Sequence, residues 1–213
     1  MSLDAKAKLV NALTFARVPL IFAWLGFAIA QEFLGGLWLG VVACFAMMAS
    51  GITDLFDGHL ARKWGVVSDL GKLADPLMDK FFYIVAFPAL VWQSARQGEG
   101  DAHTMALLGF TLLYMMRDTW VTFMRTVGTM YGADVAAMWL GKVRTALSFP
   151  GAGWVYMYLA FHTLAPESWR GPWLASCYLF EIVLIVLTLV SLVTYTVAYS
   201  PYLKKALARN RDL

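Results

Sequence analysis

The sequence has few charged residues and few cysteines. Only 15% of its 213 residues are charged, whereas soluble domains have about a quarter. Because 60% of the residues are hydrophobic, an ordinary soluble globular protein is excluded. Cys44 and Cys177 both fall inside apolar runs and lack any CxxC or Cys/His spacing. They are typical of small buried side chains and imply neither a disulfide framework nor a zinc site.

The basic residues lack the arrangement that nucleic-acid binding requires. The net charge is only +3, and the basic residues lie between apolar runs instead of forming a continuous stripe with interleaved aromatic residues. The sequence also has no internal repeat and no low-complexity segment. We therefore expect no nucleic-acid partner and a single domain over residues 1–213.

The apolar residues gather in runs of about 20, the length that crosses a hydrocarbon core of ~30 Å. Six such candidate spans are present: Leu9–Ala30, Phe33–Thr53, Leu77–Gln93, Thr104–Met124, Thr145–Leu164 and Trp173–Tyr199. The sequence therefore predicts an all-α polytopic membrane protein with six transmembrane helices, whose surroundings are the lipid bilayer.

The distribution of basic residues predicts the orientation of these spans. Fifteen of the 17 Lys and Arg residues fall near the two termini or around the second and fourth connections. Only Arg96 and Arg170 fall in the alternate connections. The positive-inside rule then places both termini and the second and fourth connections in the cytoplasm, as in a multi-pass protein of the inner or plasma membrane.

Polar residues interrupt the first apolar run. Asn11, Thr14 and Arg17 lie within it, and a cleaved secretory signal would not need them. They favour a retained helix that binds something.

Acidic and small residues recur at helical spacing on both sides of the second connection. The first set stands at i, i+3, i+4 and i+7, and the second at i, i+4 and i+8: Asp54, Asp57, Gly58 and Ala61, then Gly71, Asp75 and Asp79. In a helix, each of these spacings places its residues on one face. Two such faces opposed to each other would surround one pocket.

The four aspartates of these faces predict a metal site. Clustered carboxylates repel one another, and an ionised group at the centre of a membrane helix costs ~3 kcal/mol on insertion scales, so a cation is needed. Oxygen ligands without a nearby Cys favour Mg²⁺ or Mn²⁺, and a set this rich suits two ions. The small residues leave room for a phosphate-bearing group, whose charge Arg62 is placed to pair with.

Two other interpretations of the aspartates remain open. They could be ordinary interfacial charges solvated at a loop, which is the interpretation that suits Asp69. A metal or cation transporter also places carboxylates in a membrane, although transport sites tend to lie near the midplane and these cluster at one edge. His103 and His162 fall on the far side of the membrane and His59 has no nucleophile partner in the sequence, so all three histidines are expected to be structural.

The whole run fits D-x-x-D-G-x-x-A-R, eight residues, then G-x-x-x-D-x-x-x-D, and so resembles the signature of the CDP-alcohol phosphatidyltransferase family. The resemblance implies six spans, cytoplasmic termini and a homodimer. It implies that Asp54, Asp57 and Asp75 are metal ligands and that Asp79 is both a ligand and the general base. It also implies that a set of polar and small residues lines the CDP site: Gly58, Ala61, Arg62, Ser68 and Gly71, with Asn11 and Thr14 of the first span.

The reaction that this resemblance implies is attack by an acceptor hydroxyl on a phosphorus of CDP-diacylglycerol, with departure of CMP. Residues 117–145 are similar to the R-E, R and G-K-x-K-T pattern of bacterial phosphatidylglycerophosphate synthases, with Asp118 and Arg144 as departures. Cations beside a metal site suit an acceptor with its own phosphate, such as glycerol 3-phosphate, and we expect Arg117, Arg125 and Lys142 to bind that phosphate. Inositol phosphate, serine or another alcohol remains an alternative.

Overall fold

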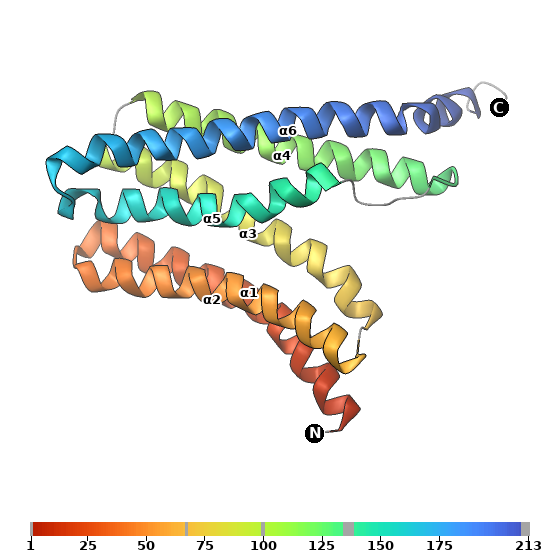
Figure 1. The fold of residues 1–213 in the computed structure, drawn as a ribbon, viewed down its shortest axis with the longest axis horizontal. Coiled ribbons are helices and arrows are strands. Elements are labelled where there is room, and N and C mark those ends of the chain that lie inside the picture. Colours follow the sequence, from red (N-terminus) through yellow and green to blue (C-terminus); the bar gives the residue numbers. More distant parts are fainter. Residues whose placement is uncertain (1, 67, 99–100, 134–138, 210–213) are drawn as a thin grey trace.

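The computed structural model of the protein describes residues 2–66, 68–98, 101–133 and 139–209. For residues 69, 70, 72, 73, 75, 76 and 140 it describes the backbone but not the side chains. The described residues form six α-helices and one short 3-10 helix, and the described part of the chain has no strand (Figure 1). The helices are α1 (Leu3–Leu34), α2 (Leu37–Trp64), α3 (Asp69–Gln97), α4 (Asp101–Met130), α5 (Trp139–Phe161), η1 (His162–Leu164) and α6 (Glu167–Arg209). The all-α prediction is confirmed.

Glycines set the ends of the helices that carry the aspartate motif. Gly35 and Gly36 have φ of 69° and 98°, which lets the chain reverse tightly between α1 and α2. Consequently α1 includes Phe33, where the sequence had suggested that the second span begins. Gly65 ends α2 in the left-handed conformation. Ser68 then caps α3 by accepting a hydrogen bond from the Gly71 amide at 3.0 Å.

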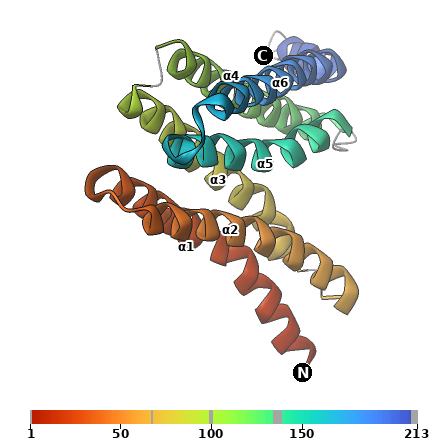
Figure 2. The ribbon, with the colours of Figure 1, turned by 60° about the vertical axis from the view of Figure 1, so that its left-hand side comes forward.

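The helices run alternately in opposite directions along the long axis of the molecule. Helices α1 and α2 pack together as a hairpin, whereas α4, α5 and α6 form a second group, in which α6 packs against both of the others. Helix α3 contacts α1 as well as α4 and α5, and so joins the two groups (Figures 1 and 2). In Figure 1 the C-terminus lies at the upper right and the N-terminus lies at the bottom of the view.

The outside of the bundle is apolar and its inside holds polar groups. Phe45, Leu179 and Val197 are more than 60% exposed, whereas Gln93, Thr188 and other polar side chains are buried. Among the described residues, three helices are long and apolar enough to cross a membrane: Leu3–Leu34, Leu37–Trp64 and Glu167–Ala208. These features indicate a multi-pass membrane protein. The six-span topology remains a prediction, as does the cytoplasmic position of the termini.

Aromatic contacts fix the middle of α3 between the two helix groups. The Phe82 ring lies 4.8 Å from that of Phe149 in α5, and the Tyr83 ring lies 5.1 Å from that of Tyr114 in α4. Tyr83 also donates a hydrogen bond to the Thr145 carbonyl at 3.2 Å. The segment of α3 that carries Asp79 is therefore held against both groups.

Candidate active site

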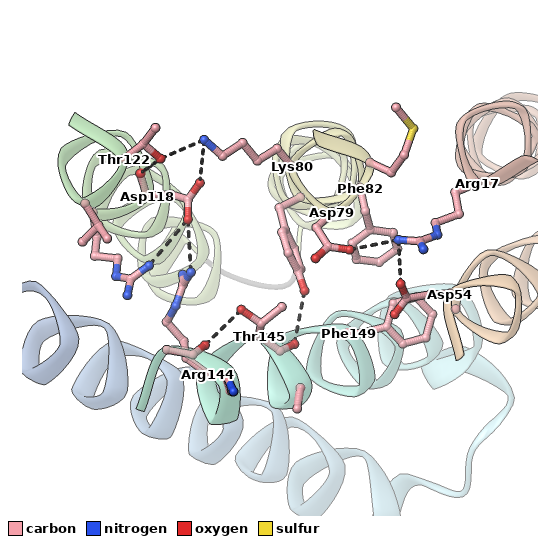
Figure 3. Close-up of a pocket in the computed structure, with 18 of the residues that line it drawn as sticks. Arg17, Asp54, Asp79, Lys80, Phe82, Asp118, Thr122, Arg144, Thr145 and Phe149 are labelled. Carbon is pink, nitrogen blue, oxygen red and sulfur yellow. Dashed lines mark hydrogen bonds and ion pairs between the residues drawn. The ribbon is translucent and has the colours of Figure 1, made fainter. Parts of the chain in front are cut away.

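Three of the four predicted aspartates converge on one arginine. Asp54 and Asp57 extend from α2 and Asp79 from α3, and all three contact the Arg17 guanidinium of α1 (Figure 3 labels Asp54 and Asp79). Arg17 Nη1 lies 2.6 Å from Asp54 Oδ1 and 3.1 Å from Asp79 Oδ1, and Nη2 lies 2.5 Å from Asp57 Oδ2. The structure therefore brings together three aspartates from the two acidic faces.

The members of this carboxylate cluster differ in exposure. The side chains of Arg17 and Asp57 are 6% and 3% exposed, whereas those of Asp54 and Asp79 are 48% and 41% exposed. Thr14 Oγ1 also donates a hydrogen bond to Asp57 Oδ2 at 2.8 Å. Asp57 is thus fixed from α1 by two donors, while Asp54 and Asp79 face open space. Asp75 lies on α3 one turn before Asp79, and its side chain is outside the described part of the structure.

The residues expected at the CDP site lie beside this cluster, around the start of α3. Ser68 Oγ donates a hydrogen bond to Asn11 Oδ1 at 3.0 Å, so the first span is tied to the α3 cap. A Cβ atom added to Gly71 would lie 3.1 Å from Ser68 Oγ, which shows how closely the backbone approaches there. The structure therefore brings Asn11, Ser68 and Gly71 together.

The other expected CDP-site residues lie on α2. A Cβ added to Gly58 would meet Arg62 Nη1 at 3.4 Å, in ordinary van der Waals contact. Ala61 is partly exposed, and Arg62 is exposed at the end of the helix. Gly58 and Arg62 are therefore neighbours, and Thr14 joins the group through Asp57.

A second charged cluster surrounds Asp118 on α4. Its carboxylate lies 3.5 Å from Lys80 Nζ, 3.5 Å from Arg117 Nη1 and 3.2 Å from Arg144 Nη2. Lys80 also donates a hydrogen bond to Thr122 at 2.9 Å. Figure 3 shows this cluster across α3 from the carboxylate cluster. Successive residues of a helix point about 100° apart, so the adjacent Asp79 and Lys80 reach different clusters.

The two arginines of the Asp118 cluster are buried and held by further groups. Arg117 is 4% exposed, donates a hydrogen bond to Ser191 and lies 5.2 Å from the centre of the Tyr195 ring. Arg144 is 3% exposed and lies 4.0 Å from the centre of the Tyr114 ring. Such cation–π contacts stabilise desolvated guanidinium groups. Each of the two arginines is therefore buried and contacts both Asp118 and an aromatic ring.

One cavity of ≈ 1080 Å³ connects both clusters. Arg117, Arg125 and Lys142, the residues expected to bind the acceptor phosphate, all line it, as do Asp54 and Asp79. Among the side chains that the structure describes, the charged lining comprises six cations and three carboxylates: Arg17, Lys80, Arg117, Arg125, Lys142 and Arg144 with Asp54, Asp79 and Asp118. The excess of positive charge suits an anionic ligand.

Apolar side chains complete the cavity wall on the side of α2 and α5. Met48, Ile52 and Leu55 contribute from α2, and Phe149 and Pro150 contribute from α5. A lipid-like ligand needs such a wall beside its charged head group. Both kinds of surface are therefore present in the same space.

Several residues of the site were not predicted as such. Arg17 was noted only as a polar interruption of an apolar run, yet it is the common partner of three aspartates. Asp118 and Arg144 were noted only as departures from the synthase pattern, and Lys80 was counted only among the basic residues around the second connection. The sequence did indicate that these residues have partners, because an ionisable side chain inside an apolar run is usually paired with a charged or polar group. The identity of each partner was not visible, because Arg17 and Asp79 are 62 residues apart.

The carboxylate cluster offers oxygen atoms, the type of ligand atom that a divalent cation such as Mg²⁺ binds. Among the side chains that the structure describes, no three of His, Cys, Asp or Glu form a ready-made metal site. However, Asp54, Asp57 and Asp79 already direct oxygen atoms toward one shared positive group. Oxygen-only donors are those that Mg²⁺ and Mn²⁺ prefer.

A helical membrane protein that opposes carboxylates and buried cations across one cavity has the parts of a metal-dependent phosphotransferase. The chain belongs to the CDP-alcohol phosphatidyltransferase family, which it matches over residues 7–200. Enzymes of this family generally depend on a divalent metal. The membership favours the enzyme over the metal transporter.

Relatives of known activity match most of the chain. It is 28% identical to a cardiolipin synthase (CMP-forming) of Streptomyces coelicolor over 78% of this chain and 77% of that protein. It is 32% identical to a CDP-diacylglycerol–glycerol-3-phosphate 3-phosphatidyltransferase of Treponema pallidum over 75% of this chain and 70% of the relative. The enzyme with the same name from Bacillus subtilis is 30% identical over 64% of this chain and 70% of that enzyme.

Proposed function

We propose that this protein transfers the phosphatidyl group of CDP-diacylglycerol to the hydroxyl of glycerol 3-phosphate and releases CMP. The observation that carries the proposal is one cavity lined by Asp54 and Asp79 from α2 and α3 and by Arg117, Arg125 and Lys142 from α4 and α5. A donor diphosphate needs the first set of residues and a phosphorylated acceptor needs the second. The names of the Treponema and Bacillus relatives support the same pair of substrates.

In this proposal Asp54, Asp57, Asp75 and Asp79 hold Mg²⁺ or Mn²⁺, with two ions balancing four carboxylates. Ions held by these residues would supply positive charge to polarise the attacked phosphorus and to stabilise CMP as it leaves. The cytidine side of the donor lies against the group formed by Asn11, Thr14, Gly58, Ala61, Arg62, Ser68 and Gly71. The close approach of backbone at Gly71 and the exposed guanidinium of Arg62 support this assignment.

Asp79 is the proposed general base. Its half-exposed carboxylate lines the cavity, which gives an acceptor hydroxyl access to it. Asp79 takes the proton as the hydroxyl oxygen bonds to phosphorus and the bond from that phosphorus to CMP breaks. Arg117, Arg125 and Lys142 meanwhile hold the acceptor phosphate, which fixes the distance between hydroxyl and phosphorus.

The proposed setting is a bacterial inner or plasma membrane, with the active site and both termini facing the cytoplasm. The basic residues near the termini and around the second and fourth connections support this orientation. We further propose that residues 1–213 act as one domain and that the enzyme works as a homodimer, as the family resemblance implies.

The decisive test is CMP release from purified protein given CDP-diacylglycerol and Mg²⁺ or Mn²⁺, with each acceptor offered separately. Glycerol 3-phosphate is expected to give CMP and phosphatidylglycerophosphate, and chelation of the metal is expected to stop both. Activity with serine or inositol phosphate alone would refute the proposal that glycerol 3-phosphate is the acceptor. No CMP release with any acceptor, together with metal flux into proteoliposomes, would refute the transferase activity and favour a metal transporter.

A second candidate is CMP-forming cardiolipin synthesis. The Streptomyces relative, which matches 78% of this chain, favours it, and so do the apolar residues of the cavity wall. Cardiolipin carries two phosphatidyl groups on one glycerol, so this reaction requires phosphatidylglycerol as the acceptor. In the same assay with phosphatidylglycerol as one of the acceptors, formation of cardiolipin from it and no phosphatidylglycerophosphate from glycerol 3-phosphate would select this candidate.

A further inference from the structure

The position of Arg17 has a steric consequence for metal binding. Its Nη1 atom lies between Asp54 Oδ1 and Asp79 Oδ1, at 2.6 Å and 3.1 Å. A divalent ion shared by these two carboxylates must lie about 2.0–2.6 Å from an oxygen of each. That ion and the guanidinium nitrogen therefore compete for one position.

The charges of the cluster lead to the same conclusion. Three carboxylates against one guanidinium leave an excess of negative charge, which attracts a divalent ion. Once an ion is bound, its charge repels the guanidinium. Asp57 keeps its hydrogen bond from Thr14 when Arg17 moves, so this carboxylate stays in place.

We infer that Arg17 is an exchangeable counter-ion of the carboxylate cluster: it holds Asp54, Asp57 and Asp79 together before metal binds and releases them when metal enters. The inference rests on the proposed function, since it takes these aspartates as the metal ligands. Arg17 also lines the cavity, so the released guanidinium remains where the phosphates of the substrates are expected. Arg17 is thus a positioning residue that becomes available for an anionic substrate only in the metal-loaded protein.

Direct Mn²⁺ binding tests the exchange without reference to activity. Wild type, Arg17→Gln and Lys8→Gln are titrated with Mn²⁺ in detergent and the free ion is measured by electron paramagnetic resonance. Lys8 is the matched control, because it is an exposed cation of the same helix that pairs with Asp4 instead of the cluster. Loss of a competing cation is expected to tighten Mn²⁺ binding on the order of tenfold in Arg17→Gln and to leave Lys8→Gln unchanged.

A second measurement uses only the wild-type protein and so does not depend on the folding of a variant. Phenylglyoxal modifies accessible arginines, and the modified peptides are quantified by mass spectrometry. Arg17 is expected to react several-fold faster with Mn²⁺ than with EDTA, because its guanidinium leaves a buried position. Arg96, which is exposed on α3 far along the chain from the motif, is expected to react equally in both.

The outcomes separate this inference from the function on which it rests. Suppose that the wild type binds Mn²⁺ and releases CMP, but Arg17→Gln binds Mn²⁺ no more tightly than the wild type. The inference that metal displaces Arg17 is then wrong, and the proposed function stands. An Arg17 modification rate that ignores Mn²⁺ also contradicts the exchange. Absence of Mn²⁺ binding by the wild type overturns both the metal site and the exchange.

Discussion

Asp79 faces the cavity with a half-exposed carboxylate, and its proposed role can be tested by one change. Asp79→Asn keeps the size of the side chain but removes the ability to take a proton. We expect the rate of CMP release to fall at least about 100-fold, which is the usual contribution of a general base. Equilibrium binding of CDP-diacylglycerol is expected to change little, because the other aspartates remain.

Asp4→Asn is the control for this substitution, since Asp4 is an exposed carboxylate that pairs only locally with Lys8 in the contacts described. It is expected to behave as wild type in both assays. A rate of CMP release for Asp79→Asn equal to that of wild type would refute the role of Asp79 as general base.

Lys142 is an exposed cation at the cavity, and its proposed partner is the acceptor phosphate. Lys142→Ala is expected to raise the KM for glycerol 3-phosphate about fivefold, as for a partly solvated charged hydrogen bond, and to leave the KM for the lipid unchanged. Steady-state kinetics with each substrate varied in turn measure both values. Lys204→Ala, an exposed lysine outside the cavity, should change neither, and an unchanged acceptor KM in Lys142→Ala would exclude the contact.

At the scale of whole elements, α4 and α6 meet closely at Gly128. A Cβ added there would lie 2.6 Å from the Tyr199 ring and 3.2 Å from the Ala133 Cβ. Gly128→Ala is therefore expected to lower the free energy of unfolding by about 1–3 kcal/mol through overpacking. Thermal unfolding in detergent measures the change.

Gly109 offers a matched control on the same helix. A Cβ added to Gly109 meets nothing within 4 Å. Gly109→Ala is expected to be neutral or to stabilise the protein by up to about 1 kcal/mol, because alanine favours the helix. Equal stabilities of the two variants would show that the α4–α6 contact tolerates a larger residue.

The elements of the motif were predictable because their information is local. The spacing of Asp54 and Asp57 required a helix and a common face, and α2 provides both. The partners across helices were not predictable, because helix packing brings together residues far apart in sequence. The Asp118 contacts with Lys80 and Arg144 and the buried His103–Glu181 pair, at 2.9 Å, arise in this way. Their ionisable side chains indicated only that partners exist.

At the scale of the whole molecule, the proposed orientation predicts which positions are reached from outside the cell. In a background of Cys44→Ala and Cys177→Ala, a cysteine replacing Arg96 is expected to react with an impermeant maleimide in intact cells. A cysteine replacing Lys204 is expected to react only after the membrane is opened. The reverse labelling pattern would invert the topology, and equal labelling of both would contradict the six spans.

The contact between Arg17 and the aspartates of α2 has a consequence for how the chain enters the membrane. Each of these helices carries charge into an apolar run, and a single charge at the helix centre costs ~3 kcal/mol on insertion scales. Only Gly35 and Gly36 separate the two helices, so α1 meets its counter-charges as soon as α2 is made. The two helices therefore favour insertion as one hairpin, in which each lowers the cost of burying the charge of the other.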